Sequence, residues 1–431
     1  KMFEQMGKTN APEDSQTAIS SLSYTNLDDI NSEIIDRNRK LYGRSHESQQ
    51  LLRIYDDVVS HNCSKTVIIH GSSGSGKTSL VAAFRDVICD NNAFFCSGKF
   101  FQNVDVHEPY SAFTAAFSDL CDIMGQAGEL QEHRWKIVQD ELGANFYNFS
   151  RMISVASPWC PNVETSEVVG ETKNDAAFLQ FKISCRRFLR AVSSPEHPIV
   201  IFIDDIQWMD NGSKQLLDFL ISDDHYLQNI FIIISYRDEE SDAIPELVKY
   251  VESSSNIVKI FVDNLDKDAV FDLLSDKLQS KSKEINEFSE ILWLKTAGNA
   301  FQILQLLDSI QVEGLLIYDT ASNEWQFDVE KIQEQIQASE SLVNLVLQKV
   351  KRSSPETQLA CKVASILGYR FNEKIVRDIA VKFSHQFAID SCPISHHKAV
   401  IVGLREGVSS GFIERKKRGF QFSHDKIQSC F

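Results

Sequence analysis

The chain has 431 residues, a formal net charge of -16, and apolar and charged fractions of 43% and 24%. This length accommodates about three domains with separate cores, and the composition is that of an ordinary globular protein. The acidic balance disfavours nucleic acid as a partner of the whole chain. No apolar run approaches the ~20 residues of a membrane-spanning helix, and no secretory signal pattern opens the chain.

The nine cysteines are scattered, odd in number and never spaced C-x-x-C. This pattern argues against a disulfide framework and against a zinc site, and it indicates reduced thiols in an intracellular, cytoplasmic setting. Because the sequence starts at Lys1 and stops at Phe431 within an amphipathic segment, we expect it to be a piece of a longer protein.

Residues 1–37 are polar and are predicted to be a disordered leader. In residues 38–263, apolar strands alternate with helical patterns, which predicts an α/β domain with a parallel sheet and helices on both of its faces. The predicted strands are 66–70, 93–95, 199–203, 230–235 and 258–261, and the predicted helices include 78–89, 110–124 and 174–193.

A glycine-rich loop with the pattern G-x-x-x-x-G-K-T follows the first predicted strand, at residues 71–78. Its glycines let successive backbone N–H groups point at a phosphate, and the positive N-terminal end of the next helix adds to this. Lys77 is placed to reach the β- and γ-phosphates, and the Thr78 hydroxyl is placed to bind Mg²⁺. The candidate nucleotide-binding residues are Gly71, Ser72, Ser73, Gly74, Ser75, Gly76, Lys77, Thr78 and Ser79.

A Gly/Ser-rich linker is the alternative interpretation of residues 71–78, since such linkers are common. The apolar strand 66–70 and the amphipathic helix 78–89 give the loop the strand–loop–helix context that the phosphate-binding motif requires. The context therefore favours a nucleotide site, and with it a P-loop NTPase fold.

An acidic pair follows the apolar strand 199–203. A strand of this kind belongs in a parallel sheet that is buried on both faces, and its carboxyl end lies in the crevice where such sheets bind ligands. Asp204 is the candidate metal ligand, and Asp205 is the candidate to orient or deprotonate an attacking water. An acidic turn would be the better interpretation if residues 71–78 were absent.

Residues 264–339 turn helical and predict a small helical lid with a hairpin at 315–327. Residues 340–431 predict a winged-helix-like domain, truncated at its C-terminal end. Ser354 and Pro355 mark a helix start, and strands at 411–414 and 419–422 are joined by four basic residues. These basic residues, 415–418, suit either a DNA-reading wing or a solvated turn, and we favour the turn.

Several segments together resemble one family, the AAA+-type ATPase module of the STAND class in its origin-recognition-like branch. Such modules lie inside large signalling proteins, beside protein kinase, hybrid histidine kinase or nucleotide cyclase domains. The resemblance covers the chain from about residue 40 to its end. The matching segments are LYGR at 41–44, the loop at 71–78, GKFFQ at 98–102, PY at 109–110, FIDDIQWMD at 202–210, SYRDE at 235–239, TAGN at 296–299 and FSHDKIQ at 422–428.

The resemblance implies further site residues. Tyr42, Gly43 and Arg44 would line an adenine pocket; taken alone, they suit a loop before a helix equally well. Arg237 would be the sensor of the γ-phosphate, with a surface pair to the carboxylates that follow it as the alternative. His424 would contact the β-phosphate of ADP and lock a closed state, although a lone histidine is more often structural.

Two departures from the family pattern concern the lid. The Gly-Asn-Pro motif of the family is replaced by an alanine at position 300, which removes a rigid proline beside the adenine site. The helix predicted at 301–310 has no arginine, so the second sensor of many AAA+ machines is missing. The missing sensor suits a STAND-type switch better than a processive ring motor, whereas Ala300 keeps open the alternative of a nucleotide-binding scaffold without turnover.

The leading hypothesis is therefore a slowly hydrolysing, nucleotide-operated switch that uses ATP, ADP and Mg²⁺. Its proposed catalytic residues are Lys77, Asp204, Asp205 and Arg237, and its metal ligands are Thr78 and Asp204. We expect its partners to be output signalling domains in the same full-length chain and other proteins, with nucleotide-dependent self-association left open. The alternatives are an origin-recognition-like DNA-binding ATPase, a P-loop kinase of a small molecule, and a nucleotide-binding scaffold without turnover.

Overall fold

The computed structural model describes residues 40–90, 92–102, 109–125, 130–146, 149–150, 153, 175–222, 226–243, 256–319, 324–338, 347, 349–382, 396–416 and 419–431. Residues 42–431 cluster as one compact unit, and everything below concerns this unit. The leader predicted at 1–37 lies outside the described residues.

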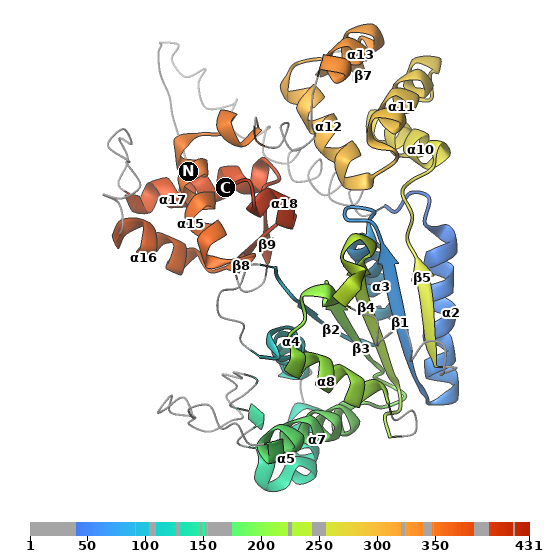
Figure 1. Cartoon of the computed structure of the whole chain (residues 1–431), viewed down its shortest axis with the longest axis vertical. Coiled ribbons are helices and arrows are strands. Elements are labelled where there is room, and N and C mark those ends of the chain that lie inside the picture. Colours follow the sequence, from blue (N-terminus) through green and yellow to red (C-terminus); the bar gives the residue numbers. More distant parts are fainter. Residues whose placement is uncertain are drawn as a thin grey trace, which may run out of the picture. The chain divides into compact units, whose positions relative to one another are not determined.

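A five-stranded parallel sheet organises the first part of the unit, with the strand order β2-β3-β4-β1-β5 (Figure 1). This confirms the predicted α/β fold class. Strand β2 is longer than the predicted 93–95 and places Lys99 directly beside Asp204 of β3. The strands are β1 (Ser64–Gly71), β2 (Phe94–Lys99), β3 (Ile199–Asp204), β4 (Ile230–Arg237) and β5 (Ile257–Phe261).

Helices pack on both faces of this sheet, as Figure 1 shows. The three predicted helices 78–89, 110–124 and 174–193 form within one residue of their expected ends, whereas α5 was not predicted. The helices are α2 (Ser45–His61), α3 (Lys77–Cys89), α4 (Ser111–Gly125), α5 (Leu130–Leu142), α7 (Asp175–Val192) and α8 (Asn211–Ile221), with short 3₁₀ turns η1 (Gly143–Asn145), η2 (Ile206–Trp208) and η3 (Asp238–Ala243).

A group of helices and a hairpin follows the sheet. It shares one hydrophobic cluster that runs from Leu265 to Ile332, and its hairpin confirms the one predicted at 315–327. The elements are α10 (Lys267–Leu278), α11 (Lys283–Thr296), α12 (Ala300–Val312), β6 (Leu316–Asp319), β7 (Glu324–Phe327) and α13 (Val329–Ala338).

The C-terminal segment has a separate cluster, and its antiparallel sheet has the order β8-β10-β9. Ser354 caps α15 and Pro355 begins it, as predicted. The turn predicted at 415–418 is wrong in one respect, because Arg415 and Lys416 belong to strand β9. The elements are α15 (Pro355–Leu367), β8 (Arg370–Phe371), α16 (Glu373–Lys382), α17 (His396–Ser409), β9 (Ile413–Lys416), β10 (Gly419–Phe422) and α18 (Asp425–Gln428).

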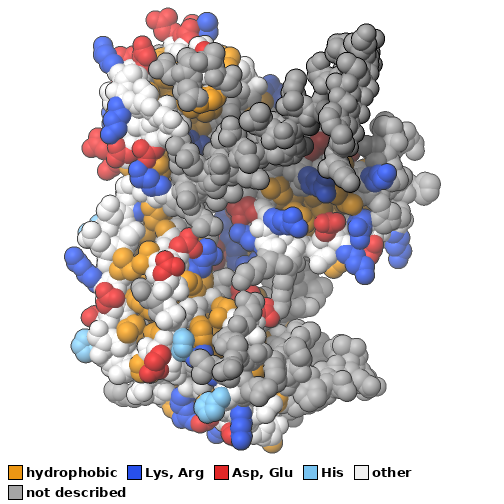
Figure 2. All heavy atoms as spheres, turned by 180° about the vertical axis from the view of Figure 1, so that it is seen from behind, with side chains coloured by type: hydrophobic (Ala, Val, Ile, Leu, Met, Phe, Trp, Pro, Cys, Tyr) orange, Lys and Arg blue, Asp and Glu red, His pale blue; other side chains and the backbone are white. Residues whose placement is uncertain are grey.

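The surface mixes both signs of charge. On the face drawn in Figure 2, acidic side chains lie among the basic ones, with patches of hydrophobic side chains between them. Within the described residues, we find no helix that combines the length and the apolar character needed to cross a bilayer.

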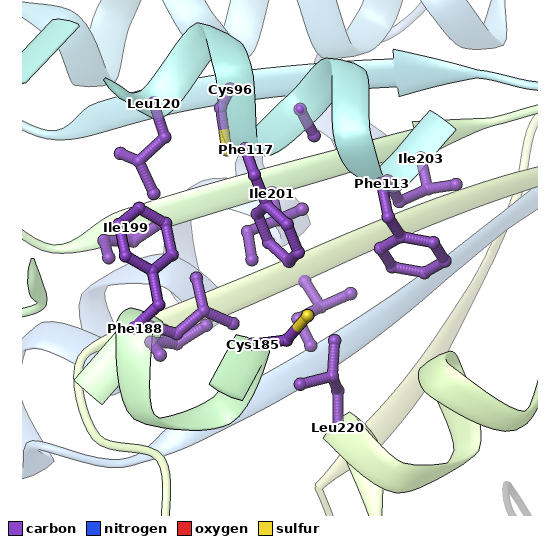
Figure 3. Packing of buried hydrophobic residues seen from close by; sticks show 14 of the residues in the cluster. Cys96, Phe113, Phe117, Leu120, Cys185, Phe188, Ile199, Ile201, Ile203 and Leu220 are labelled. Carbon is purple, nitrogen blue, oxygen red and sulfur yellow. The ribbon is translucent and has the colours of Figure 1, made fainter. Parts of the chain in front are cut away.

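The alternation of side chains along the strands divides the core of the sheet into two layers. Ile199, Ile201 and Ile203 of β3 face α4 and α7, where they meet Phe117 and Phe188 (Figure 3). On strand β4, Phe231 contacts the rings of Tyr55 in α2 and Phe84 in α3 instead. This double burial fixes the sheet rigidly, so the residues at its carboxyl edge are held in place.

Candidate functional site

The loop between β1 and α3 bends where only glycine fits. Gly71 has a φ of 152°, and a Cβ at this position would lie 2.1 Å from the Val262 carbonyl oxygen. Gly74 has a φ of 82°, and a Cβ there would lie 2.7 Å from Asn299 Oδ1. The loop is therefore packed closely against Val262, the residue after β5, and against Asn299, the residue before α12.

Lys77 is folded back into this loop. Its Nζ donates hydrogen bonds to the carbonyls of Gly71 and Ser72, both at 2.9 Å. Burial lowers the pKa of the Lys77 ammonium, and the carboxylates of Asp205 and Asp204 oppose this only in part. A bound anion would reverse that shift, which is what a buried cation in a phosphate-binding loop requires.

Ser75, at the centre of the loop, supplies a second sign that the loop fits a polar ligand. Its Oγ is buried and has no hydrogen-bond partner in the described part of the chain. Buried hydroxyls are normally hydrogen-bonded, so an unpaired one in the loop that also holds Lys77 suits a ligand with oxygen acceptors such as a phosphate.

Asp204 ends strand β3 at the mouth of the loop. Its Oδ2 accepts a hydrogen bond from Thr78 Oγ1 at 3.1 Å, and its Oδ1 accepts one from Ser235 Oγ of β4. A hydroxyl and a carboxylate side by side, at the N-terminal end of α3, are the oxygen ligands that Mg²⁺ takes next to nucleotide phosphates. The two residues predicted as metal ligands are thus brought together and fit that ion.

Asp205 has a left-handed backbone (φ 56°), and its carboxylate is surrounded by cations. Lys99 Nζ lies 2.5 Å from its Oδ2, and the Arg237 guanidinium donates to both carboxylate oxygens at 3.1 Å. Gln207 Nε2 donates at 3.0 Å to Oδ1. Burial by itself would raise the pKa of this carboxyl, but Lys99 and Arg237 hold it below its usual value.

Arg237, at the end of β4, joins two carboxylates. Besides Asp205 it reaches Asp425 of α18, with Nη2 and Oδ2 2.7 Å apart, and its Cζ lies 4.5 Å from the ring centroid of Trp208. Burial opposes the charge, but Asp205 and Asp425 raise the pKa of the guanidinium above its usual range. A fully charged arginine is therefore shared between the sheet edge and the C-terminal segment.

The carboxylates that follow Arg237 have other partners. Asp238 Oδ1 lies 2.9 Å from His70 Nδ1, and the Glu239 carboxylate accepts a hydrogen bond from the backbone N–H of Ser73 at 3.1 Å. The pairing considered as an alternative for Arg237 is thus replaced by longer-range pairs.

Tyr42, Gly43 and Arg44 lie between the loop and the helical lid. The Tyr42 hydroxyl donates to Asp276 of α10 at 3.1 Å. Arg44 is buried and donates to the carbonyls of Ser75, at 2.9 Å, and Asp263. Burial lowers the pKa of its guanidinium. Arg44 therefore connects the loop at residues 71–78 to the segment that leads into α10.

The first turn of α12 also contacts the loop. Asn299 caps the helix through Oδ1 and donates from Nδ2 to the Ser73 carbonyl at 2.9 Å. The backbone N–H of Phe301 donates to the Gly74 carbonyl at 3.1 Å. The helix begins at Ala300 without the proline of the family motif.

His424 lies against that same turn. Its ring stacks on Phe301 with centroids 4.0 Å apart. Its Nδ1 lies 2.6 Å from Asp425 Oδ1 and 3.1 Å from the Lys426 backbone nitrogen, so it either donates to the carboxylate or accepts from the amide. Burial would raise the pKa of the Asp425 carboxyl, but His424 and Arg237 hold it far below its usual value.

Three of these residues have roles that sequence reasoning did not assign, namely Lys99, Asn299 and Asp425. Asn299 had a visible signal, since asparagine before a helical pattern is a cap. Lys99 and Asp425 both lie in segments that carried the family resemblance, yet nothing local to either residue indicates its ionic partners.

Comparison with known proteins gives a family match for the segment that carries the loop and the acidic pair. Residues 40–233 match the AAA ATPase domain family. The matched segment contains Lys77, Thr78, Asp204 and Asp205, whereas Arg237 and His424 lie beyond the match.

The chain is also similar to the hybrid signal transduction histidine kinase G of Dictyostelium discoideum, with 23% identity over 409 residues. The match covers 80% of this chain but only 12% of that protein. The chain thus spans about an eighth of its curated relative.

Similar solved structures include a Walker-type ATPase of Pyrococcus abyssi, with 15% identity and a TM-score of 0.37 over 90% of this chain and 95% of that one. They also include the ORC2 protein of Aeropyrum pernix in ADPNP–ADP complexes, with 12% identity and a TM-score of 0.42 over 91% and 93%. Cdc6p from Pyrobaculum aerophilum has 12% sequence identity and a TM-score of 0.38, over 91% of this chain and 93% of that one. These TM-scores are too low to place any residue.

Proposed function

We propose that this chain is an ATP- and ADP-binding switch module of a multidomain signal-transduction protein, with slow Mg²⁺-dependent hydrolysis. The observation that carries the proposal is the position of Arg237, which pairs with Asp205 at the sheet edge and with Asp425 in the C-terminal segment. One cation thus connects the place of phosphate chemistry to the element that a switch has to move.

Nucleotide binding rests on the phosphate-binding loop of the segment that matches the AAA ATPase domain family. Lys77 and the backbone N–H groups at the start of α3 would hold the phosphates, and Thr78 with Asp204 would hold Mg²⁺. The metal would neutralise charge on the β- and γ-phosphates. Tyr42, Gly43 and Arg44 are proposed to line the adenine side.

Competition for Arg237 is the proposed switching step. A γ-phosphate near the loop competes with Asp425 for the same guanidinium, because the fork of Arg237 already serves Asp205. With ADP there is no such competitor, so Asp425 and its neighbour His424 keep the C-terminal segment against α12. ATP would therefore favour release of that segment and ADP its retention.

Slow turnover follows from the environment of Asp205. A general base works best with a pKa near the working pH, but Lys99 and Arg237 lower the pKa of this carboxyl. Its ion pairs also have to loosen before it can orient water. We therefore expect Asp205 to support hydrolysis weakly while its two cations are in place.

The similarity to a protein named as a hybrid histidine kinase supports the proposal that this chain is part of a longer signalling protein. Output domains in the same chain, and protein partners, are the proposed recipients of the switch.

The DNA-binding alternative is less well supported. Lys416 of the basic cluster is paired with Glu414, with Nζ and Oε2 2.7 Å apart. Lys417 and Arg418 lie outside the described residues. A paired lysine on an acidic chain is a weak footprint for a phosphate backbone.

The test is to denature the purified protein and to identify released nucleotide by chromatography. We expect ADP in near-stoichiometric amount, and loss of the ADP in a Lys77→Met variant. Protein that carries no nucleotide and binds neither ATP nor ADP in a titration would contradict the proposal.

An Asp205→Asn variant separates a switch that hydrolyses ATP from a scaffold that only binds it. Turnover of ATP should fall at least tenfold in this variant, as for other residues that position the attacking water. Unchanged turnover would show that Asp205 has no catalytic part, and absent turnover in the unaltered protein would favour the scaffold.

A further inference from the structure

Lys99 contacts the carboxylates of both Asp204 and Asp205, although it belongs neither to the loop at residues 71–78 nor to the acidic pair itself. It ends strand β2, and the register of the sheet sets it beside Asp204. Its side chain is only 15% exposed, and its Nζ lies 2.5 Å from Asp205 Oδ2 and 3.4 Å from Asp204 Oδ2. The single ammonium charge is therefore shared between the two carboxylates.

One oxygen of Asp204 is shared. Its Oδ2 contacts Lys99 and also accepts the Thr78 hydroxyl at 3.1 Å. Because Thr78 and Asp204 form the proposed metal site, this is an oxygen that Mg²⁺ would face. An ammonium and a divalent cation on one carboxylate oxygen repel each other strongly in a buried site, so Lys99 has to withdraw when the metal enters.

The opposite side of Lys99 faces the C-terminal segment. Its Nζ lies 5.2 Å from the ring centroid of Tyr369, the residue before β8. The same ring contacts Phe101 with centroids 5.3 Å apart, and Tyr369 is buried. Lys99 at the end of β2 and Phe101, two residues beyond it, thus contact the same aromatic ring, and a cation over such a ring is attracted to its face.

We propose that Lys99 is a metal-responsive cation, which balances Asp204 and Asp205 without Mg²⁺ and links Mg²⁺ entry to loosening of Tyr369. The proposal rests on the nucleotide site proposed above and names a regulator of it. Mg²⁺ and docking of the C-terminal segment then compete through one lysine, separately from the competition at Arg237.

The test compares ADP affinity in Mg²⁺ with ADP affinity in EDTA, by titration calorimetry. In a Lys99→Met variant the competing charge is gone, so we expect the ratio of the two affinities to rise about tenfold, within the usual range for coupled sites. A Lys99→Arg variant keeps the charge and should stay near the unaltered ratio.

Lys267→Met is the matched control. Lys267 also pairs with a carboxylate, Glu290, at 2.7 Å and lies 5.0 Å from a ring centroid, that of Trp293, but in the lid. This variant should leave the ratio unchanged. An equal ratio in Lys99→Met and in the unaltered protein would overturn the proposal.

A second measurement reports on Tyr369. Adding Mg²⁺ to the ADP-bound protein should speed hydrogen exchange in peptides that cover β8–β10, and this increment should vanish in Lys99→Met. An increment that persists there would overturn the link to the C-terminal segment. If Lys99→Met does not fold, Tyr369→Leu provides the test, because loss of the ring should raise the affinity ratio and remove the increment.

Thermal unfolding with Mg²⁺ alone separates this inference from the proposed function. If ADP does not bind to the unaltered protein, the nucleotide proposal fails, yet Mg²⁺ should still stabilise Lys99→Met more than the unaltered protein. Equal stabilisation would overturn the role of Lys99 by itself.

Discussion

Single charged residues determine what this site does, and Asp425 is the clearest case. Its carboxylate contacts Arg237 at 2.7 Å, and its pKa is held far below the usual value by His424 and Arg237 against the effect of burial. A carboxyl with a depressed folded-state pKa stabilises the fold above its unfolded pKa, about 4, and that stability is lost as the pH falls below it.

We therefore expect Asp425→Asn to be less stable than the unaltered protein near pH 7, by about 1–3 kcal/mol for a charged hydrogen bond. The difference should shrink as the pH is lowered through 4, because the unaltered protein loses the contribution that the variant never had. Denaturant unfolding at several pH values measures this. Asp328→Asn is the control, since Asp328 pairs with Lys331 at the surface; a gap of the same size there would point to a general charge effect.

Unlike the charge of Asp425, the charge of Lys77 is expected to lower the stability of the nucleotide-free protein. Burial lowers the pKa of its ammonium, so this charge costs stability when no anion is bound. Lys77→Met should weaken ADP binding at least tenfold while leaving the nucleotide-free protein no less stable. Calorimetric titration and thermal unfolding give the two values. Lys65→Met is the control. It removes a lysine that pairs with Asp57 at 2.8 Å outside the loop, and it should leave both the ADP affinity and the stability of the nucleotide-free protein close to those of the unaltered protein.

At the scale of elements, helix α12 belongs to the group of helices after the sheet, and its first turn contacts the loop at residues 71–78. Asn299 caps it and also binds the Ser73 carbonyl. Asn299→Ala should cost about 1 kcal/mol for the cap and also lower ADP affinity. Ser282→Ala is the matched control, because Ser282 caps α11 in the same way and is not bonded to the loop. Equal ADP affinities in the two variants would show that the bond to Ser73 does not support binding.

Strand β2 shows how an element boundary changes a site. Its sequence after Phe95 is Cys-Ser-Gly-Lys, which has weak strand propensity. Pairing with β3 nevertheless carries the strand on to Lys99. Tertiary hydrogen bonding overrides propensity here and brings the lysine to the carboxylates.

At the scale of the whole molecule, single side chains among the described residues connect the C-terminal segment to the rest of the protein. Their contacts include the pair of Asp425 with Arg237, the stack of His424 on Phe301, the pair of Lys349 with Asp308 at 2.9 Å, and one further pair that joins Arg352 to Glu313 at 3.7 Å. Contacts of this kind can be broken one at a time, as the proposed release of the segment requires.

Phe301→Ala should therefore speed hydrogen exchange in peptides that cover residues 419–431. Leu304→Ala lies on the same helix with an exposed side chain and is expected to leave this exchange unchanged. If both variants exchange alike, the stack on His424 does not hold the segment.

The sequence by itself determined the parallel sheet, the strand–loop–helix unit around Lys77, the acidic end of β3 and the cap of α15. Each of these is written in local pattern, as apolar periodicity, glycine spacing or a capping residue. The partners of the charges were decided only by the tertiary structure. Lys99, Asp205, Arg237 and Asp425 come from strand β2, the position after β3, strand β4 and a C-terminal helix, and no local rule states which cation meets which carboxylate. Their pairing depends on strand order, register and the docking of a distant segment, so the switch proposed here is a property of the assembled fold.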